Sequence, residues 1–309
     1  MKFFLKLVWS GDPLQPYILI SDEEGSIEKS LLEFGSPFNL RILETGFCIG
    51  TEPEKGKWIS CIENKKRVGQ DAQLPNLAIQ GKQCALCIKE EYFACRKTCT
   101  GKYCTPSSQM AYNLCQPAET AVYLTRIGSK NKVGVSLNPL RRWVEQGSDF
   151  ATWIVKLPGL EARAVEQEVA KSFSFNLQIG SKQKMSEAHT KPTPDSIEEL
   201  NQAIYAIQQI AEEIAGQRNK PLQKNQDADF IDLHNYYGDL KRINRPLQEI
   251  DIKEGVEFGG TLVAVKGAII ILEKDSYYYG VNAKKLSGCS FEFITNAKME
   301  TQLSLDDWF

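Results

Sequence analysis

Hydrophobic and polar residues alternate along the first 80 residues and again over residues 226–300. At the start, Phe3, Leu5, Leu7 and Trp9 occupy every second position, which is typical of a strand with one buried face. Short apolar runs between Gly, Pro and acidic turns predict further strands at residues 17–20, 40–43, 58–62, 261–265, 268–272, 277–281 and 291–294. We expect these two β-rich regions to pack together, with the middle of the chain inserted between them.

Residues 120–176 alternate between strand and helix patterns. Strands are predicted at residues 122–127 and 132–136, joined by a polar turn, and a third at residues 151–157. A short helix is predicted at residues 140–146, because Asn138 and Pro139 suit its start and Gly147 follows its end. The break at Pro158 and Gly159 precedes a second helix, over residues 160–173.

The strongest helical pattern covers residues 196–215, after a polar linker. Ser196 and Glu199 have the spacing of a capping box, and Gly216 is the expected end of the helix. Six aliphatic residues share one face of this helix and are expected to pack in a core: Ile197, Leu200, Ile204, Ile207, Ile210 and Ile214.

The composition is that of a folded protein, with 42% hydrophobic and 25% charged residues, and 309 residues suffice for two or three domains. The net charge of −2 gives no global basic bias, but residues 84–175 carry a net +4, which suits local contact with phosphate. No apolar run is long enough for a membrane span or a secretory signal. We therefore expect an intracellular protein with no membrane partner, whose nine cysteines form no disulfides.

The cysteines are concentrated between residues 84 and 115. Cys84 and Cys87 have the two-residue spacing that lets both thiolates bind one ion from a tight turn, and four thiolates satisfy tetrahedral Zn²⁺. We favour Cys104 and Cys115 as the second pair, because Cys115 leads directly into the strand at residues 122–127. No histidine lies near these cysteines, so the predicted role of the zinc ion is structural.

Two alternatives stay open for this segment. Cys95 and Cys99 are alternates for the second pair, and six thiolates in so short a stretch could also serve a second ion. Cys48, Cys61 and Cys289 are isolated in the sequence and are expected to be core residues.

Four residues in the alternating segment have side chains suited to phosphodiester chemistry. They are Tyr123 on the first strand, Lys132 at the start of the second, Arg142 on the short helix and Glu166 on the second helix. Their order and surroundings, including Val122-Tyr123 and Lys132-Val133-Gly134, resemble the core of the GIY-YIG nuclease superfamily. Lys132 stands where that family usually has a second tyrosine, and Ala121 stands where it usually has glycine.

The resemblance implies a role for each of these side chains. Glu166 would hold a catalytic Mg²⁺ or Mn²⁺ against a phosphate oxygen. Arg142 would bind the phosphate and offset charge that develops in the transition state. Tyr123 would position the attacking water, or help to deprotonate it if its pKa is lowered, and Lys132 would contribute charge or act as a base of lowered pKa.

The last eight residues resemble the peptide that docks on the PCNA sliding clamp. Gln302 is followed by Leu305 at +3 and by Trp308 and Phe309 at +6 and +7. One turn of 3₁₀ helix would gather the three apolar side chains into a plug for a surface pocket, with Gln302 bonding beside it. A PCNA partner implies the cytoplasm of an archaeon or the nucleus of a eukaryote.

The sequence thus predicts a multi-domain α+β protein containing a GIY-YIG-like nuclease module. The expected divisions are a β-rich region at 1–80, a zinc-binding segment at 81–117, the nuclease module at 118–180, a linker and helix at 181–225, a β-rich region at 226–300 and the clamp-binding peptide at 302–309. The predicted function is a metal-dependent DNA endonuclease of repair or replication, recruited by PCNA. The alternatives are a non-catalytic nucleic-acid-binding scaffold on the same fold and an RNA-directed nuclease.

Overall fold

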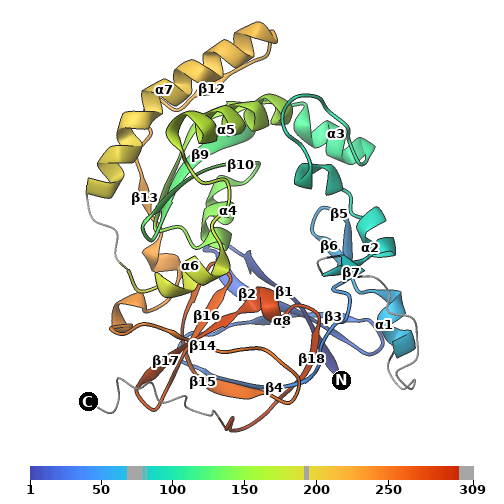
Figure 1. The fold of residues 1–309 in the computed structure, drawn as a ribbon. Helices are drawn as coiled ribbons and strands as arrows, with labels where there is room; N and C mark the ends of the chain where they lie inside the picture. The colour runs from blue at the N-terminus through green and yellow to red at the C-terminus, as the bar shows by residue number, and fades with distance from the viewer. Residues whose placement is uncertain (68–78, 81, 191–194, 299–309) are drawn as a thin grey trace.

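The computed structural model describes residues 1–67, 79–80, 82–190 and 195–298. It has a mixed α and β architecture, as predicted, built around two principal sheets. In Figure 1 the larger sheet lies below the smaller one, α4 and α6 lie between them, and the cysteine-bearing segments lie to one side. No helix in the described ranges is both long enough and apolar enough to cross a membrane.

The larger sheet unites the two ends of the chain. Within the described residues it has nine strands in the order β14-β17-β16-β15-β4-β18-β1-β2-β3. Strand β18 lies between β1 and β4, and β4 also pairs with β15. The expectation that the N- and C-terminal β-rich regions pack together is therefore confirmed. The bounds are β1 Lys2–Ser10, β2 Gln15–Asp22, β3 Ile27–Leu31, β4 Pro37–Glu44, β14 Gln248–Glu249, β15 Glu257–Lys266, β16 Ile269–Lys274, β17 Tyr277–Asn282 and β18 Cys289–Phe293.

The smaller sheet has the order β10-β9-β11-β12, with β13 also pairing with β11. On the central strand β9, Tyr123 lies opposite Gly134 of β10 and Trp153 of β11. Helix α4 follows β10, and helix α5 follows β11, as the sequence predicts to within one or two residues. The bounds are β9 Thr120–Ile127, β10 Lys130–Ser136, α4 Pro139–Gln146, β11 Phe150–Leu157, α5 Gly159–Phe173, β12 Gln223–Lys224 and β13 Ile231–Asp232.

Alternation along β9 gives the smaller sheet two different faces. Val122 and Leu124 point into a core shared with α5 and with α7, Asp195–Gln217. Tyr123 points the other way, into the core of the larger sheet, where its ring packs edge-on against Trp143 of α4. The period of two along a strand therefore places Tyr123 between the two sheets.

Two features between α5 and β12 differ from the expected linker and helix. Helix α6, Ser181–Ser186, was not predicted, and its Met185 packs against Gly280 of β17. Helix α7 does not end at Gly216 but continues to Gln217. The chain leaves the helix direction at Asn219, which adopts the left-handed conformation at φ 49° that was expected of Gly216.

A buried ion pair joins the two sheets. Asp149, in the turn between α4 and β11, is fully buried and accepts hydrogen bonds from Lys266 of β15 at 2.6 Å, from the Gly128 N–H at 2.7 Å and from His234 at 3.0 Å. Burial alone would raise the pKa of Asp149, but the hydrogen bonds from His234 and Lys266 bring it below its ordinary value.

The end of α4 also touches the larger sheet directly. Gly147 caps α4 at φ 73°, and Gly267 forms the β15–β16 turn at φ 63°. A Cβ on Gly267 would lie 2.6 Å from the Gly147 nitrogen, so the two backbones meet where no side chain fits. The Trp9 indole donates to the Gly267 carbonyl at 3.1 Å and fixes the turn from the other side.

We predict that Asp149→Asn lowers the free energy of unfolding by about 3–5 kcal/mol, because it leaves the Lys266 ammonium buried without its countercharge. Urea unfolding monitored by tryptophan fluorescence measures the change. The control is Asp239→Asn, at an exposed position, for which we expect a change within about 0.5 kcal/mol. Equal stability of the two variants would contradict a joining role for Asp149.

Candidate active site and metal centre

Four buried cysteines form one compact group: Cys48, Cys61, Cys84 and Cys87. All four sulfur atoms lie within 4.8 Å of one another. The hairpin of β5, Thr51–Glu54, and β6, Lys57–Ile59, separates the first two cysteines. The last two lie on β8, Gln83–Cys84, which pairs with β7, Ile79–Gln80, and on α2, Ala85–Lys89; α1, Ile62–Arg67, follows Cys61 directly.

The composition of this group corrects the sequence prediction. Cys84 and Cys87 are joined by Cys48 and Cys61, and not by the favoured Cys104 and Cys115. Cys48 and Cys61 were expected to be core residues because they lie far from the other cysteines in the sequence. The β5–β6 hairpin folds back and brings the two thiols together, which spacing alone does not reveal.

The geometry of the group suits a metal ion such as zinc. The Cys61 and Cys84 sulfur atoms are 3.8 Å apart, and a tetrahedron with bonds of about 2.3 Å has edges of about 3.8 Å. Hydrogen bonds from the Cys61 and Cys87 thiols lower the pKa of Cys48 to about 4. The Cys84 N–H also donates to the Cys48 sulfur at 3.2 Å. These hydrogen bonds stabilise a thiolate at Cys48, the form that binds metal, while the hydrogen bonds to Cys48 and Cys61 raise the pKa of Cys87.

Polar side chains around the group fix its loops. The Asn64 amide donates to the Cys48 carbonyl at 2.7 Å and accepts from its N–H at 3.2 Å. The Gln83 amide donates to the Gly50 carbonyl at 2.9 Å. Such outer contacts orient metal ligands before the ion binds.

A second group of candidate side chains lies between the sheets around Tyr123. Its ring lies against Gly134 so closely that a Cβ at that position would be 2.3 Å from the hydroxyl oxygen. With its amide oriented to satisfy both neighbours, Gln146 accepts from the Tyr123 hydroxyl at 2.9 Å and from Arg142 Nε at 2.8 Å. Gln146 was not predicted from the sequence, although its place four residues after Arg142, on the same face of α4, is a usable signal.

Lys132 and Glu166 are the buried charges of this group. Lys132 donates to the carbonyls of Val133, at 3.1 Å, and Leu177. Burial lowers the pKa of Lys132 to about 8, although the Glu166 carboxylate opposes the shift. Glu166 is 3% exposed and forms an ion pair with Arg163 one turn earlier on α5.

The four residues singled out from the sequence lie within electrostatic range of one another. Lys132 is influenced by both Glu166 and Arg142, and so is Tyr123. We call Tyr123, Lys132, Arg142 and Glu166 the candidate cluster. Only its Arg142 side chain, half exposed at 50%, is open to solvent, so an anion would meet the cluster there first.

The pKa of Tyr123 is shifted in the direction opposite to that needed for a base. Burial raises the pKa of the phenol, and the nearby Arg142 charge offsets this only in part. Tyr123 therefore stays protonated at neutral pH. It can orient a neighbour through its hydroxyl, but it is not suited to deprotonate water.

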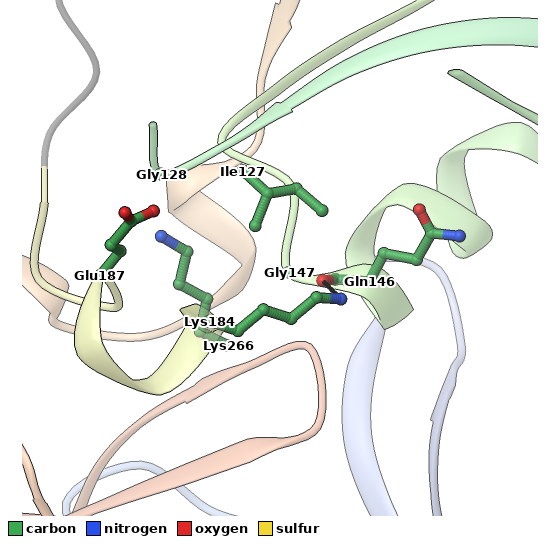
Figure 2. A pocket seen from close by; sticks show the side chains of 7 residues that line it. All are labelled: Ile127, Gly128, Gln146, Gly147, Lys184, Glu187 and Lys266. Atoms are coloured by element: carbon green, nitrogen blue, oxygen red, sulfur yellow. Dashed lines mark hydrogen bonds between the residues drawn. The ribbon is translucent and has the colours of Figure 1, made fainter. Parts of the chain in front are cut away.

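A cavity of about 10 Å³ lies behind the cluster, between α4 and α6 (Figure 2). Lys184 crosses it and donates to the Gln146 carbonyl at 2.7 Å. Burial and the neighbouring cations lower the pKa of Lys184 to about 7. The space suffices for about one water molecule, so it is not a substrate pocket.

The chain matches one protein family over most of its length. The model of a family described as "Protein of unknown function (DUF2797)" matches residues 37–291. The chain belongs to the DUF2797 family. The match runs from β4 to β18 and so includes the four-cysteine group and the candidate cluster. No curated protein and no solved structure matches the chain.

The remaining predicted site of this DUF2797 protein, the peptide of Gln302, Leu305, Trp308 and Phe309, lies outside the described residues. The alternates Cys95 and Cys99 are described and lie, with Cys104 and Cys115, between α2 and β9. They are not part of the four-cysteine group.

We predict that Gly134→Ala destabilises the protein by about 1–3 kcal/mol, because the added methyl group forces the Tyr123 ring from its place. The matched control is Gly216→Ala near the end of α7, where a Cβ meets nothing within 4 Å. That change is expected to be neutral or stabilising by up to about 1 kcal/mol. Urea unfolding of both variants checks the difference, and an unperturbed Gly134→Ala protein would contradict the packing described for Tyr123.

Proposed function

We propose that this DUF2797 protein is a metal-dependent DNA endonuclease acting in DNA repair or replication. The observation that carries the proposal is the convergence of Tyr123, Lys132, Arg142 and Glu166. These residues were selected from their order in the sequence, and they lie on four different elements within electrostatic range of one another. Several cations around one buried carboxylate suit a phosphodiester and a divalent ion.

The topology of the smaller sheet adds support. A hairpin of β9 and β10, a helix, the strand β11 beside β9 and then α5 follow the order expected of a GIY-YIG-like module. The close contact of Gly134 with Tyr123 gives a physical reason for the glycine in the second signature. Fold alone implies no activity, so the weight of the proposal rests on the side chains.

Three side chains of the candidate cluster have environments that suit a particular role in phosphodiester cleavage. Arg142, half exposed, binds the scissile phosphate and offsets the charge that develops on it. Lys132, with a pKa of about 8, is partly neutral near that pH and can accept a proton from the attacking water at Nζ. Tyr123, whose hydroxyl donates to Gln146, can accept a hydrogen bond from the attacking water at its hydroxyl oxygen and so position it.

Glu166 would hold the catalytic Mg²⁺ or Mn²⁺. One carboxylate suits this ion, which is commonly bound by one or two carboxylates together with substrate phosphates and water. When bound, the ion supplies Lewis-acid polarisation of the phosphate and stabilises the leaving oxygen. In the structure Arg163 forms an ion pair with Glu166, so its side chain has to turn away before the carboxylate can bind a divalent ion. A phosphate group could promote this movement by pairing with the Arg163 guanidinium.

We assign a structural Zn²⁺ to Cys48, Cys61, Cys84 and Cys87. Four buried thiols leave no open position, which is the pattern of structural rather than catalytic zinc. The ion would hold the β5–β6 hairpin against α2 and so anchor the segment that leads into β9.

A non-catalytic nucleic-acid-binding scaffold is the second candidate. It is favoured by the ion pair between Glu166 and Arg163, which uses the carboxylate that the ion requires. An RNA-directed nuclease would use the same side chains, because phosphate contacts do not distinguish the two polymers.

Recruitment is proposed to come from the C-terminal peptide. Gln302, Leu305, Trp308 and Phe309 have the spacing that docks on a PCNA clamp, which would place the protein in an archaeal cytoplasm or a eukaryotic nucleus. The apolar plug supplies the affinity, since buried aromatic anchors dominate small interfaces.

We predict that Glu166→Gln lowers Mg²⁺-dependent cleavage on the order of 100-fold or more while nucleic-acid binding persists, because the variant keeps the shape but loses the ligand charge. Single-turnover cleavage of single-stranded, duplex and branched DNA, with RNA in parallel, measures the first effect, and fluorescence anisotropy measures the second.

The control for this variant is Glu168→Gln, an exposed position on the same helix, which should cleave like the parent. Parental cleavage by Glu166→Gln would refute the assignment of the site. Binding without cleavage by the parent under Mg²⁺ and Mn²⁺ would support the scaffold instead, and preferential cleavage of RNA would support the RNA-directed alternative.

We predict that Trp308→Ala weakens binding to the PCNA clamp of the same organism about 30-fold or more, the loss typical of an interface hot spot. Isothermal titration with the purified clamp gives the affinity, and a chain lacking residues 302–309 should not bind. Both variants are expected to cleave short linear substrates like the parent. Unchanged clamp affinity would rule out the peptide as the contact.

A further inference from the structure

We propose that Lys284 binds a backbone phosphate of the DNA strand whose scissile phosphate lies at Arg142. The inference rests on the proposed function and adds a DNA contact outside the candidate cluster. Lys284 lies on α8, Ala283–Leu286, which follows β17 in the larger sheet. The contact would therefore extend the DNA-binding surface from the smaller sheet to the larger one.

The backbone places the start of α8 near the end of α4. The Ala283 N–H donates to the Ala268 carbonyl at 2.8 Å, so α8 starts beside the β15–β16 turn. Gly267 of that turn meets Gly147, the residue that caps α4. Because Lys284 follows Ala283 directly, it also lies close to the end of α4.

Helix α6 brings another lysine to the same place. Its Lys184 donates to the carbonyl of Gln146, the last residue of α4, at 2.7 Å. Its Met185 packs against Gly280 of β17, the strand that leads into α8. Helix α6 therefore connects the end of α4 with the part of the larger sheet that carries Lys284.

The charges around Lys184 agree with this arrangement. Burial is the main cause of its lowered pKa, and the positive charges of Lys284, Lys132 and Arg142 lower it further. Lys266 also contributes, but its charge is balanced in the buried ion pair that joins the two sheets. A phosphate bound beside the remaining cations would reduce their mutual repulsion.

Lys284 and its neighbour Lys285 are both exposed but have different surroundings. Lys285 pairs with Glu249 at 2.9 Å and with Asp251 at 3.8 Å. Within the ranges that the structure describes, no acidic side chain pairs with Lys284. Its ammonium group is therefore available to an anion, whereas that of Lys285 is already engaged.

Arg142 is the second exposed cation of this surface. Glu145 lies closer to Arg141, at 2.8 Å, than to Arg142, at 3.8 Å, and the Arg142 side chain is half exposed. Two exposed cations on different elements, one of them in the candidate cluster, suit two phosphates of one strand better than a single small anion.

The test is the affinity of the full-length chain for a labelled single-stranded DNA, measured by fluorescence anisotropy without Mg²⁺ over a series of salt concentrations. We expect Lys284→Ala to weaken binding about 3–10-fold and to reduce the slope of log affinity against log salt by about 1, because one phosphate contact is lost. The matched control is Lys285→Ala, which removes the same charge from the adjacent position and should keep the parental slope. Parental affinity and slope in Lys284→Ala, or an equal loss in both variants, would overturn the proposal.

A charge reversal provides a second variant. Lys284→Glu should bind DNA more weakly than Lys284→Ala while its urea unfolding midpoint stays parental, since the position is exposed. Parental DNA affinity in folded Lys284→Glu would also overturn the proposal. A parent that shows the Lys284 effect on binding but cleaves no DNA would refute the nuclease and leave this surface standing. Cleavage by the parent with unchanged DNA affinity in Lys284→Ala would do the reverse.

Discussion

The buried ion pair of Asp149 and Lys266 determines where the candidate cluster lies. Asp149 ends the turn after α4, and Lys266 ends β15, so their contact fixes α4 between the two sheets. Such a pair is tolerated in the interior because His234 and the Gly128 N–H occupy the remaining lone pairs of the carboxylate. Arg142 and Gln146 are carried on α4. Their positions relative to Tyr123 therefore depend on this electrostatic joint and on the contact of Gly147 with Gly267.

Burial determines the direction of the pKa shifts in the candidate cluster. Desolvation lowers the pKa of Lys132 and raises that of Tyr123, which moves the proton-accepting role away from the phenol and towards the amine. Lysine at the position of the expected tyrosine is thus chemically consistent with a base at this site. The ion pair of Glu166 with Arg163 has the opposite effect, since it satisfies the carboxylate without a divalent ion. The first effect favours the proposed nuclease, and the second favours the proposed scaffold.

Local signals in the sequence were sufficient to predict the helices and strands around the candidate cluster. Asn138, Pro139 and Gly147 bound α4 through short-range hydrogen bonds and backbone preferences, so its limits could be predicted to within a residue. The four-cysteine group could not, because Cys48 and Cys61 meet Cys84 only through the β5–β6 hairpin and a backbone hydrogen bond from Ile49 to Lys82, which joins segments far apart in the sequence. Gln146 was missed for a related reason: an amide has no distinctive chemistry until its two neighbours, Tyr123 and Arg142, are placed beside it.

The cysteine segments and the candidate cluster are linked through α5. Its apolar side chains, such as Val165, pack under the smaller sheet, while Gly159 faces Cys115, the last residue of α3, Gln109–Cys115, and Ala164 faces Gly101. A helix held on two sides can present Glu166 with little freedom, which favours a preorganised site over one assembled on binding. Arg163 links the cysteine-bearing segment to the candidate cluster, since it donates to the Arg96 carbonyl and also pairs with Glu166. A change in the segment between α2 and α3 that moves Arg96 would therefore alter how firmly Arg163 holds the Glu166 carboxylate. It would also alter the availability of Glu166 to a divalent ion.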